Sequence, residues 1–195
     1  MLRVRLPDKT VVLGISLGLG VATTLNAQVI NAVATISSQS LGGGMYDYVI
    51  NLQNSASSTS SIETFWYAWL PSGENFLVSS PSSVTPPNAS WSYNISYGYY
   101  DYYYYDYGIE FTSTTDPINP GSSRNFEFVS SDPPSVINGE STIYPGYQVG
   151  TSYVYSGIVS GAMEQIVVTQ AVPEPSLAGL FALGGLIWCA RRFRP

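Results

Sequence analysis

Few side chains of this sequence could act as catalysts. It has no histidine, and its one cysteine, Cys189, lies in an apolar segment near the C-terminus. Serine–histidine relays, cysteine–histidine pairs and histidine-ligated metals are therefore excluded, and residues 28–170 have no lysine for serine–lysine chemistry. A carboxylate pair, as glycoside hydrolases use, remains. The candidates by residue type are Glu63, Glu74, Asp101, Asp106, Glu110 and Glu127. Because surface carboxylates are ordinarily solvated, we expect no enzyme, no cofactor and no metal site.

A tyrosine-rich segment between residues 97 and 107 could contact sugars. Eight of its eleven residues are tyrosine, namely Tyr97, Tyr99, Tyr100, Tyr102, Tyr103, Tyr104, Tyr105 and Tyr107. Tyrosines would fall on both faces of a strand, so the segment predicts a protruding hairpin or loop rather than a half-buried strand. Tyrosine offers an apolar ring to sugar C–H groups and a hydroxyl for hydrogen bonding. A glycan-contacting patch is one interpretation, and a low-complexity hairpin tip without a binding function is the other.

The residues that would position this segment predict an all-β domain. Short runs rich in β-branched and aromatic residues alternate with clusters of Gly, Pro, Ser and Asn, which is typical of a β-sandwich or barrel. The expected strands are residues 29–37, 46–52, 62–70, 75–79, 91–97, 108–112, 124–129, 151–159 and 163–169. Residues 62–70 are the most apolar run and should form a central strand. We expect a single β-sandwich over residues 28–170, immunoglobulin- or fibronectin-like or jelly-roll-like, with almost no helix inside it.

The charge of this region limits its partners. Residues 28–170 contain one basic residue, Arg124, and eleven acidic residues, which gives a formal charge of −10. Such a region repels nucleic-acid phosphates, so we expect no nucleic-acid binding. The region also lacks cysteine, so its stability must come from its core without disulfides.

The N-terminus has the composition of a secretory signal peptide. Arg3, Arg5 and Lys9 precede an uncharged apolar run over residues 11–21, which has the length of a signal-peptide core. We expect a helical signal peptide over residues 1–27, with cleavage between Ala27 and Gln28. Cleavage after Ala22 is the second choice. An uncleaved membrane helix is less favoured because the run is too short to cross a bilayer.

The C-terminus carries three signals in a fixed order. The first is the motif Val172, Pro173, Glu174, Pro175 and Ser176, the second is the uncharged run of residues 177–190, and the third contains Arg191, Arg192 and Arg194. The prolines keep the motif extended, as a protease substrate must be. As a helix, residues 177–190 would span roughly 21 Å, against roughly 30 Å of hydrocarbon, so they can enter a membrane as a single transmembrane helix. The arginines of residues 191–195 should stay cytoplasmic.

This order resembles the PEP-CTERM sorting signal of exported bacterial proteins, here over residues 171–195. The stretches around residues 64–71, 75–77 and 144–157 are similar to uncharacterised β-rich ectodomains that carry the same signal. The resemblance implies processing near Pro173, Glu174 and Pro175 by exosortase, a membrane protease, after a transient stay in the inner membrane. It also implies a destination at the cell surface or outside the cell, in an organism that makes exopolysaccharide. An ordinary C-terminal anchor is the alternative.

The expected function follows from these segments together. We expect an exported structural or adhesive protein of the cell surface or extracellular matrix, linked to exopolysaccharide. The alternative is a carbohydrate-binding module that uses the tyrosine segment of residues 97–107.

Overall fold

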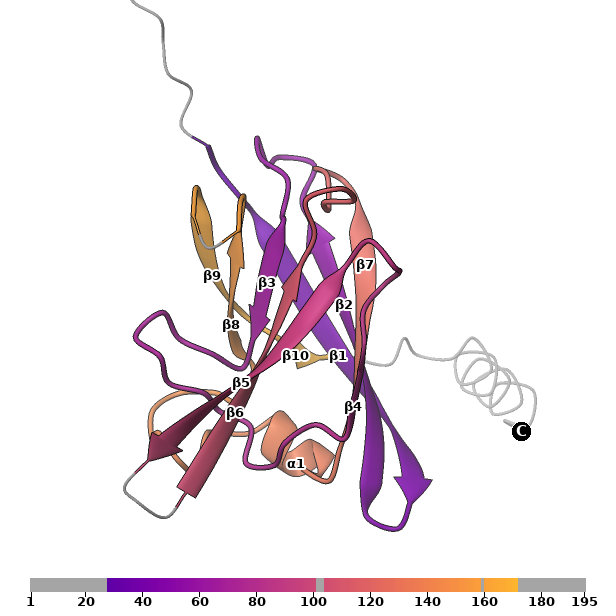
Figure 1. The fold of residues 1–195 in the computed structure, drawn as a ribbon, viewed down its shortest axis with the longest axis vertical. Helices are drawn as coiled ribbons and strands as arrows, with labels where there is room; N and C mark the ends of the chain where they lie inside the picture. The colour runs from indigo at the N-terminus through magenta and orange to yellow at the C-terminus, as the bar shows by residue number, and fades with distance from the viewer. Residues whose placement is uncertain (1–27, 101–103, 159, 172–195) are drawn as a thin grey trace, which may run out of the picture.

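The computed structural model describes residues 28–100, 104–158 and 160–171, which form two five-stranded β-sheets (Figure 1). The β1 sheet has the order β10-β1-β2-β7-β4, and the β3 sheet has the order β5-β6-β3-β8-β9. The strands of the first are Thr169–Gln170, Ala32–Gly42, Met45–Asn54, Ser123–Ser130 and Ser83–Thr85, in that order. Those of the second are Ser92–Tyr100, Tyr104–Thr112, Thr64–Tyr67, Thr151–Tyr155 and Met163–Val167. One short helix, α1, spans Pro134–Ile137.

Aromatic rings from both sheets meet in one core. In β2 the alternate residues Tyr48, Ile50 and Leu52 are fully buried and form the inward face of that strand. Phe126 of β7 lies 5.3 Å from Phe65 of β3 and 4.7 Å from Phe111 of β6, measured between ring centroids. Because these contacts join one sheet to the other, the two sheets face each other as the layers of a sandwich. The prediction of an all-β fold is confirmed.

The strand from residues 62–70 is central in its sheet as expected, but only Thr64–Tyr67 is regular. It ends at Ala68, whose φ of 56° lies in the left-handed region and breaks the pleat. The expected strand over residues 75–79 is wrong. There the chain makes only two isolated bridges, Trp69 with Asn75 and Leu77 with Tyr107. The turn at Gly73, with φ of 104°, brings the chain back to Ala68, whose carbonyl oxygen accepts from the Phe76 N–H at 3.0 Å.

Two elements arise where turn residues predict none. The three residues of β4 lie between Pro81 and Pro86 and pair with β7 at the edge of the β1 sheet. An edge strand tolerates flanking prolines because its outer N–H groups need no ladder partner. Helix α1 begins at Pro134, a residue preorganised for a first helical turn.

Strand β10 closes the described chain against its beginning. Among the described strands, β10 and β1 form the one parallel pair, with Thr169 opposite Thr35 and Gln170 opposite Ile36 of β1. The backbone N–H of Ala171 then donates to the carbonyl oxygen of Ile36 at 2.8 Å. The last described residue is thus still attached to the sandwich.

Several predicted features lie outside the described residues. These are the signal peptide with Ala27, the motif of residues 172–176, the helix of residues 177–190 and the arginines after it. None of the helices within residues 28–100, 104–158 and 160–171 is long and apolar enough to cross a bilayer. The immunoglobulin-like or jelly-roll-like subtype stays a prediction.

Candidate functional site: the tyrosine hairpin

The tyrosine-rich segment forms the far half of a hairpin made by β5 and β6, as expected. The register pairs Tyr97 with Tyr107, Tyr99 with Tyr105 and Tyr100 with Tyr104. Strand β3 pairs only with residues 109–112 of β6, so the tyrosine half extends past its neighbour (Figure 1). The hairpin turn, with Asp101, Tyr102 and Tyr103, lies outside the described residues.

One face of the hairpin passes gradually from core to solvent. Ile109 is fully buried, and at two-residue steps along β6 Tyr107 is half-buried and Tyr105 is 51% exposed. Tyr97, opposite Tyr107, is 65% exposed. Residues two apart share a face, so the tyrosines continue the core-facing side of the β3 sheet beyond the end of the core. Tyr97 and Tyr105 therefore offer ring surface to a ligand.

The opposite face holds a buried carboxylate. Asp106 is only 1% exposed, and its Oδ2 accepts a hydrogen bond from the Tyr144 hydroxyl at 2.9 Å. Its Oδ1 accepts from Asn75 Nδ2 at 3.5 Å. A Cβ at Gly98, the cross-strand partner of Asp106, would lie 2.3 Å from that Oδ1, so only glycine leaves room for the carboxylate. Asp106 thus attaches two loops to the hairpin and does not face a ligand.

The other candidate carboxylates lie on different elements, with Glu110 on β6, Glu127 on β7 of the other sheet, and Glu63 and Glu74 in the segments before and after β3. No hydrogen bond joins any two of Glu63, Glu74, Asp106, Glu110 and Glu127 within the part of the chain that the structure describes. Glu74 accepts a short hydrogen bond from the Ser72 hydroxyl. Within the residues that the structure describes, no group of three or more His, Cys, Asp or Glu side chains could hold a metal ion.

Two half-buried carboxylates give the sandwich a pH dependence. Burial raises the pKa of Glu110 on β6, and it also raises the pKa of Glu164 on β9, whose Oε2 accepts a hydrogen bond from the Ala32 N–H at 2.6 Å. A raised pKa means that the folded state binds protons more readily than the unfolded state does. The free energy of unfolding should therefore increase as pH falls from 7 toward these raised pKa values.

Replacing Glu110 tests this dependence. Glu110→Gln removes a group that is costly to ionise, so it should raise the melting temperature at pH 7 and flatten its rise between pH 7 and pH 5. Thermal unfolding followed by circular dichroism at the two pH values measures both effects. Glu140→Gln changes the net charge equally at an exposed site and is the control. An equal change in slope for both variants would contradict the assignment to Glu110.

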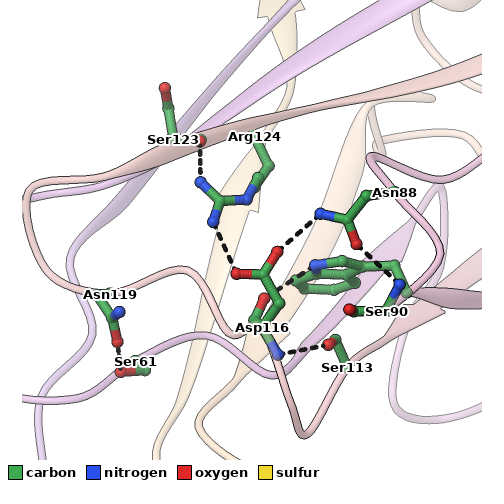
Figure 2. A network of polar contacts seen from close by, with 9 residues as sticks. Ser61, Asn88, Ser90, Ser113, Asp116, Asn119, Ser123 and Arg124 are labelled. Carbon is green, nitrogen blue, oxygen red and sulfur yellow. Dashed lines mark hydrogen bonds and ion pairs between the residues drawn. The ribbon is translucent and has the colours of Figure 1, made fainter.

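A polar network around Asp116 joins its loop to Asn88 and to Arg124 of β7 (Figure 2). Asp116 Oδ1 lies 2.8 Å from Arg124 Nη2, and Asp116 Oδ2 accepts from Asn88 Nδ2 at 2.7 Å. The Asp116 carbonyl oxygen accepts from Trp91 Nε1 at 2.9 Å, and its N–H donates to Ser113 Oγ at 3.1 Å. The hydrogen bond from Arg124 has the largest effect on the pKa of the Asp116 carboxyl group, and the one from Asn88 the next largest. Both lower this pKa. Arg124, the one cation of residues 28–170, is thereby held in an ion pair.

A polar depression that sequence analysis missed lies beside this network, on the outer face of the β1 sheet. Its volume is about 490 Å³, and its lining residues are Asn51, Thr85, Pro86, Pro87, Ser123, Arg124, Asn125 and Glu127. Asn51 Nδ2 donates to Asn125 Oδ1 at 2.7 Å across β2 and β7. Because successive side chains of β2 and β7 point to opposite faces, both amides point outward. This alternation can be read from the sequence. The depression offers amides and hydroxyls to a polar ligand but has no aromatic ring in its lining.

Known structures resemble this chain only remotely. No family model and no curated protein matches the sequence. Two crystal structures of a GH20 exo-β-N-acetylglucosaminidase from Vibrio harveyi, one of an inactive mutant and one with N-acetylglucosamine, align with 73% of this chain. Their TM-scores are 0.40 and 0.41, at 11% and 10% identity, and the chain spans 19% of their length. A cohesin module from Clostridium perfringens aligns with 72% of the chain and 100% of its own length, with a TM-score of 0.33 at 11% identity. Such similarity assigns no function to the chain.

Proposed function

We propose that this chain is an exported β-domain that acts by contact, without catalysis, at the cell surface or in an extracellular polymer matrix. In this proposal a PEP-CTERM signal sorts the chain, and exosortase processes it near Pro173, Glu174 and Pro175. The observation that carries the proposal is the order of the Pro-Glu-Pro motif, the uncharged run and the arginines at the end of an acidic β-domain.

The position of the motif relative to the sandwich supports processing. The last described hydrogen bond of the domain, from Ala171 to Ile36, immediately precedes Val172. A cut at or after Val172 would remove no strand from either sheet. The folded domain would leave the membrane whole.

The placement of the carboxylates supports contact rather than catalysis. Asp106 and Asp116 both bind loop residues of the sandwich itself. Their acceptor capacity is used to hold the fold, so that little remains for a reacting substrate.

Mass spectrometry of both chain ends tests the sorting proposal. Protein isolated from membranes and from culture medium should begin near Gln28, and the medium form should end within residues 172–176. Replacing Pro173 and Pro175 by alanine should retain the full C-terminus in the membrane fraction. Full-length chain in the cytosol, with Met1 and Arg194 present, would overturn the proposal.

Glycan contact by the hairpin is the second candidate function, and the exposure of Tyr97 and Tyr105 on one hairpin face favours it. Two exposed rings at diagonal positions on one hairpin face suit the apolar faces of sugar units. Hydrogen bonds from the hydroxyls would add orientation without a charged group, as neutral polysaccharide requires.

Changing both rings tests this candidate. Tyr97→Ser with Tyr105→Ser should weaken binding to a polysaccharide or glycan array by roughly tenfold or more, as expected when two aromatic anchors are truncated. Asn51→Ala with Asn125→Ala is the matched control, because it changes the polar depression and leaves the hairpin intact. Unchanged binding after the tyrosine changes removes the candidate, and loss only in the asparagine variant moves the site to the depression.

A further inference from the structure

The outer edge of β5 is the longest strand edge that the described residues leave uncovered. β5 ends the β3 sheet and has nine residues, whereas the other edge strands β9, β4 and β10 have five, three and two. Long edge strands pair readily with other strands unless charge, proline or a covering loop prevents it. None of the nine residues of β5 is charged or proline.

The ladder geometry shows which groups of β5 face this edge. Tyr107 and Leu77 exchange two backbone hydrogen bonds of 2.9 Å on the side of β6 that faces away from β5. The pair Tyr97–Tyr107 is therefore not hydrogen-bonded, and the N–H and C=O of Tyr97 point to the outer edge of β5. The register has no shift, so the N–H and C=O of Tyr93 and Ile95 point the same way. No backbone group of the described residues hydrogen-bonds to these groups of Tyr93 and Ile95.

The sequence of β5 is self-complementary around Ile95. Residues 93–97 are symmetric by chemical class, with the polar Asn94 and Ser96 on either side of Ile95 and the aromatic Tyr93 and Tyr97 beyond them. In an antiparallel pair centred on Ile95, each Tyr93 lies opposite Tyr97 of the second copy. Their rings are 48% and 65% exposed, so both are accessible for the cross-strand aromatic contacts that stabilise sheets. The outward N–H and C=O groups also face each other in this register.

Charge favours β5 over β9 as the edge that two acidic copies can share. Residues 28–170 carry a formal charge of −10, so most surfaces of two copies repel. The β9 edge includes Glu164, and two copies paired there would bring carboxylates together. Pairing through β5 brings no charged residue of either edge strand into contact.

We propose that two copies of the chain pair antiparallel through β5, with the two-fold axis at Ile95, so that their β3 sheets join into one ten-stranded sheet. The interface is distinct from the proposed sorting, and it shares Tyr97 but not Tyr105 with the candidate glycan contact. Its test needs no glycan, so failure of one proposal leaves the other standing.

Cysteine cross-linking tests the register. In the proposed pair, residue 94 of one copy faces residue 96 of the other, at a non-hydrogen-bonded position with Cα atoms about 4.5 Å apart, within disulfide range. Full-length chain in mild detergent, with Cys189→Ser, is prepared as two differently tagged forms, Asn94→Cys and Ser96→Cys. Mild oxidation of the mixture should give a disulfide between the two tags, several times more than either form gives alone. No mixed disulfide, or equal amounts in all three samples, overturns the proposal.

A proline tests the edge hydrogen bonds. Tyr93→Pro removes one outward N–H without removing a hydrogen bond between β5 and β6, whereas Tyr93→Val keeps that N–H. Sedimentation should show a dimer for the parent chain and the valine variant, and self-association weakened roughly tenfold or more by proline. Circular dichroism spectra that match that of the parent chain show that a variant is folded. If the proline variant does not fold, the cross-linking experiment alone tests the proposal. A monomeric parent chain, or equal dimers in a folded proline variant, contradicts the proposal.

Discussion

Phe126→Ala should destabilise the sandwich by about 3–5 kcal/mol, the range for removing a buried phenylalanine ring. Phe126 is fully buried, and its ring contacts those of Phe65, Phe111 and Trp91 at centroid distances of 5.3, 4.7 and 5.1 Å. The change therefore opens a cavity between the sheets at a point where both contribute. Since domains of this size are stable by only about 5–15 kcal/mol, the change would remove about a fifth or more of the total stability. Denaturant unfolding followed by tryptophan fluorescence measures the loss.

Tyr105→Ala is the matched control for this prediction. It also removes an aromatic ring, but from a side chain that is 51% exposed and lies outside the proposed β5 interface. It should change the free energy of unfolding by about 0.5 kcal/mol or less. Similar losses for the two variants would mean that the aromatic cluster around Phe126 does not hold the sheets together.

Gly150→Ala is the second change with a large expected effect. A Cβ at Gly150 would lie 2.3 Å from the backbone oxygen of Val168, and the Val168 N–H donates to the Gly150 carbonyl at 2.8 Å. The Cβ would clash with a backbone atom whose position a backbone hydrogen bond fixes, so the strain cannot be relieved by rotating a side chain. Overpacking of this kind costs about 1–3 kcal/mol and sometimes more. Thermal unfolding should show the loss.

Thr169→Ala is the control for the glycine substitution, because Thr169 is exposed and adjacent to the same junction. It should leave the melting temperature nearly unchanged. If Gly150→Ala is equally mild, the close approach of residues 150 and 168 does not constrain the fold.

The fold was predictable where one periodicity dominated. The two-residue alternation of β2 and the apolar run around β3 predict a buried face and a central strand, and both are confirmed. The predictions for residues 75–79 and for β4 failed because tertiary contacts decided them. Leu77 bridges to Tyr107 across the hairpin, and β4 exists only because β7 presents a free edge.

The candidate site was predictable in part. The tyrosine content and the interspersed glycines predict a hairpin, since tyrosines on both faces do not suit a half-buried strand. The burial of Asp106 was not predictable from local sequence. Its partners Asn75 and Tyr144 are 31 and 38 residues away, and only the assembled loops bring them to it. The depression around Asn51 depends in the same way on β7 lying beside β2.

The parallel pairing of β10 with β1 has a mechanical consequence. Tension applied to the chain beyond Ala171 reaches the domain first at the contacts of Thr169, Gln170 and Ala171 with β1. These contacts are few and exposed, whereas the next residue inward, Val168, is buried and bonded to Gly150. If the domain is pulled from its C-terminal side, the residues after Val168 would therefore detach from β1 at low force. The contacts of Val168 would resist further detachment, so the two sheets would stay together.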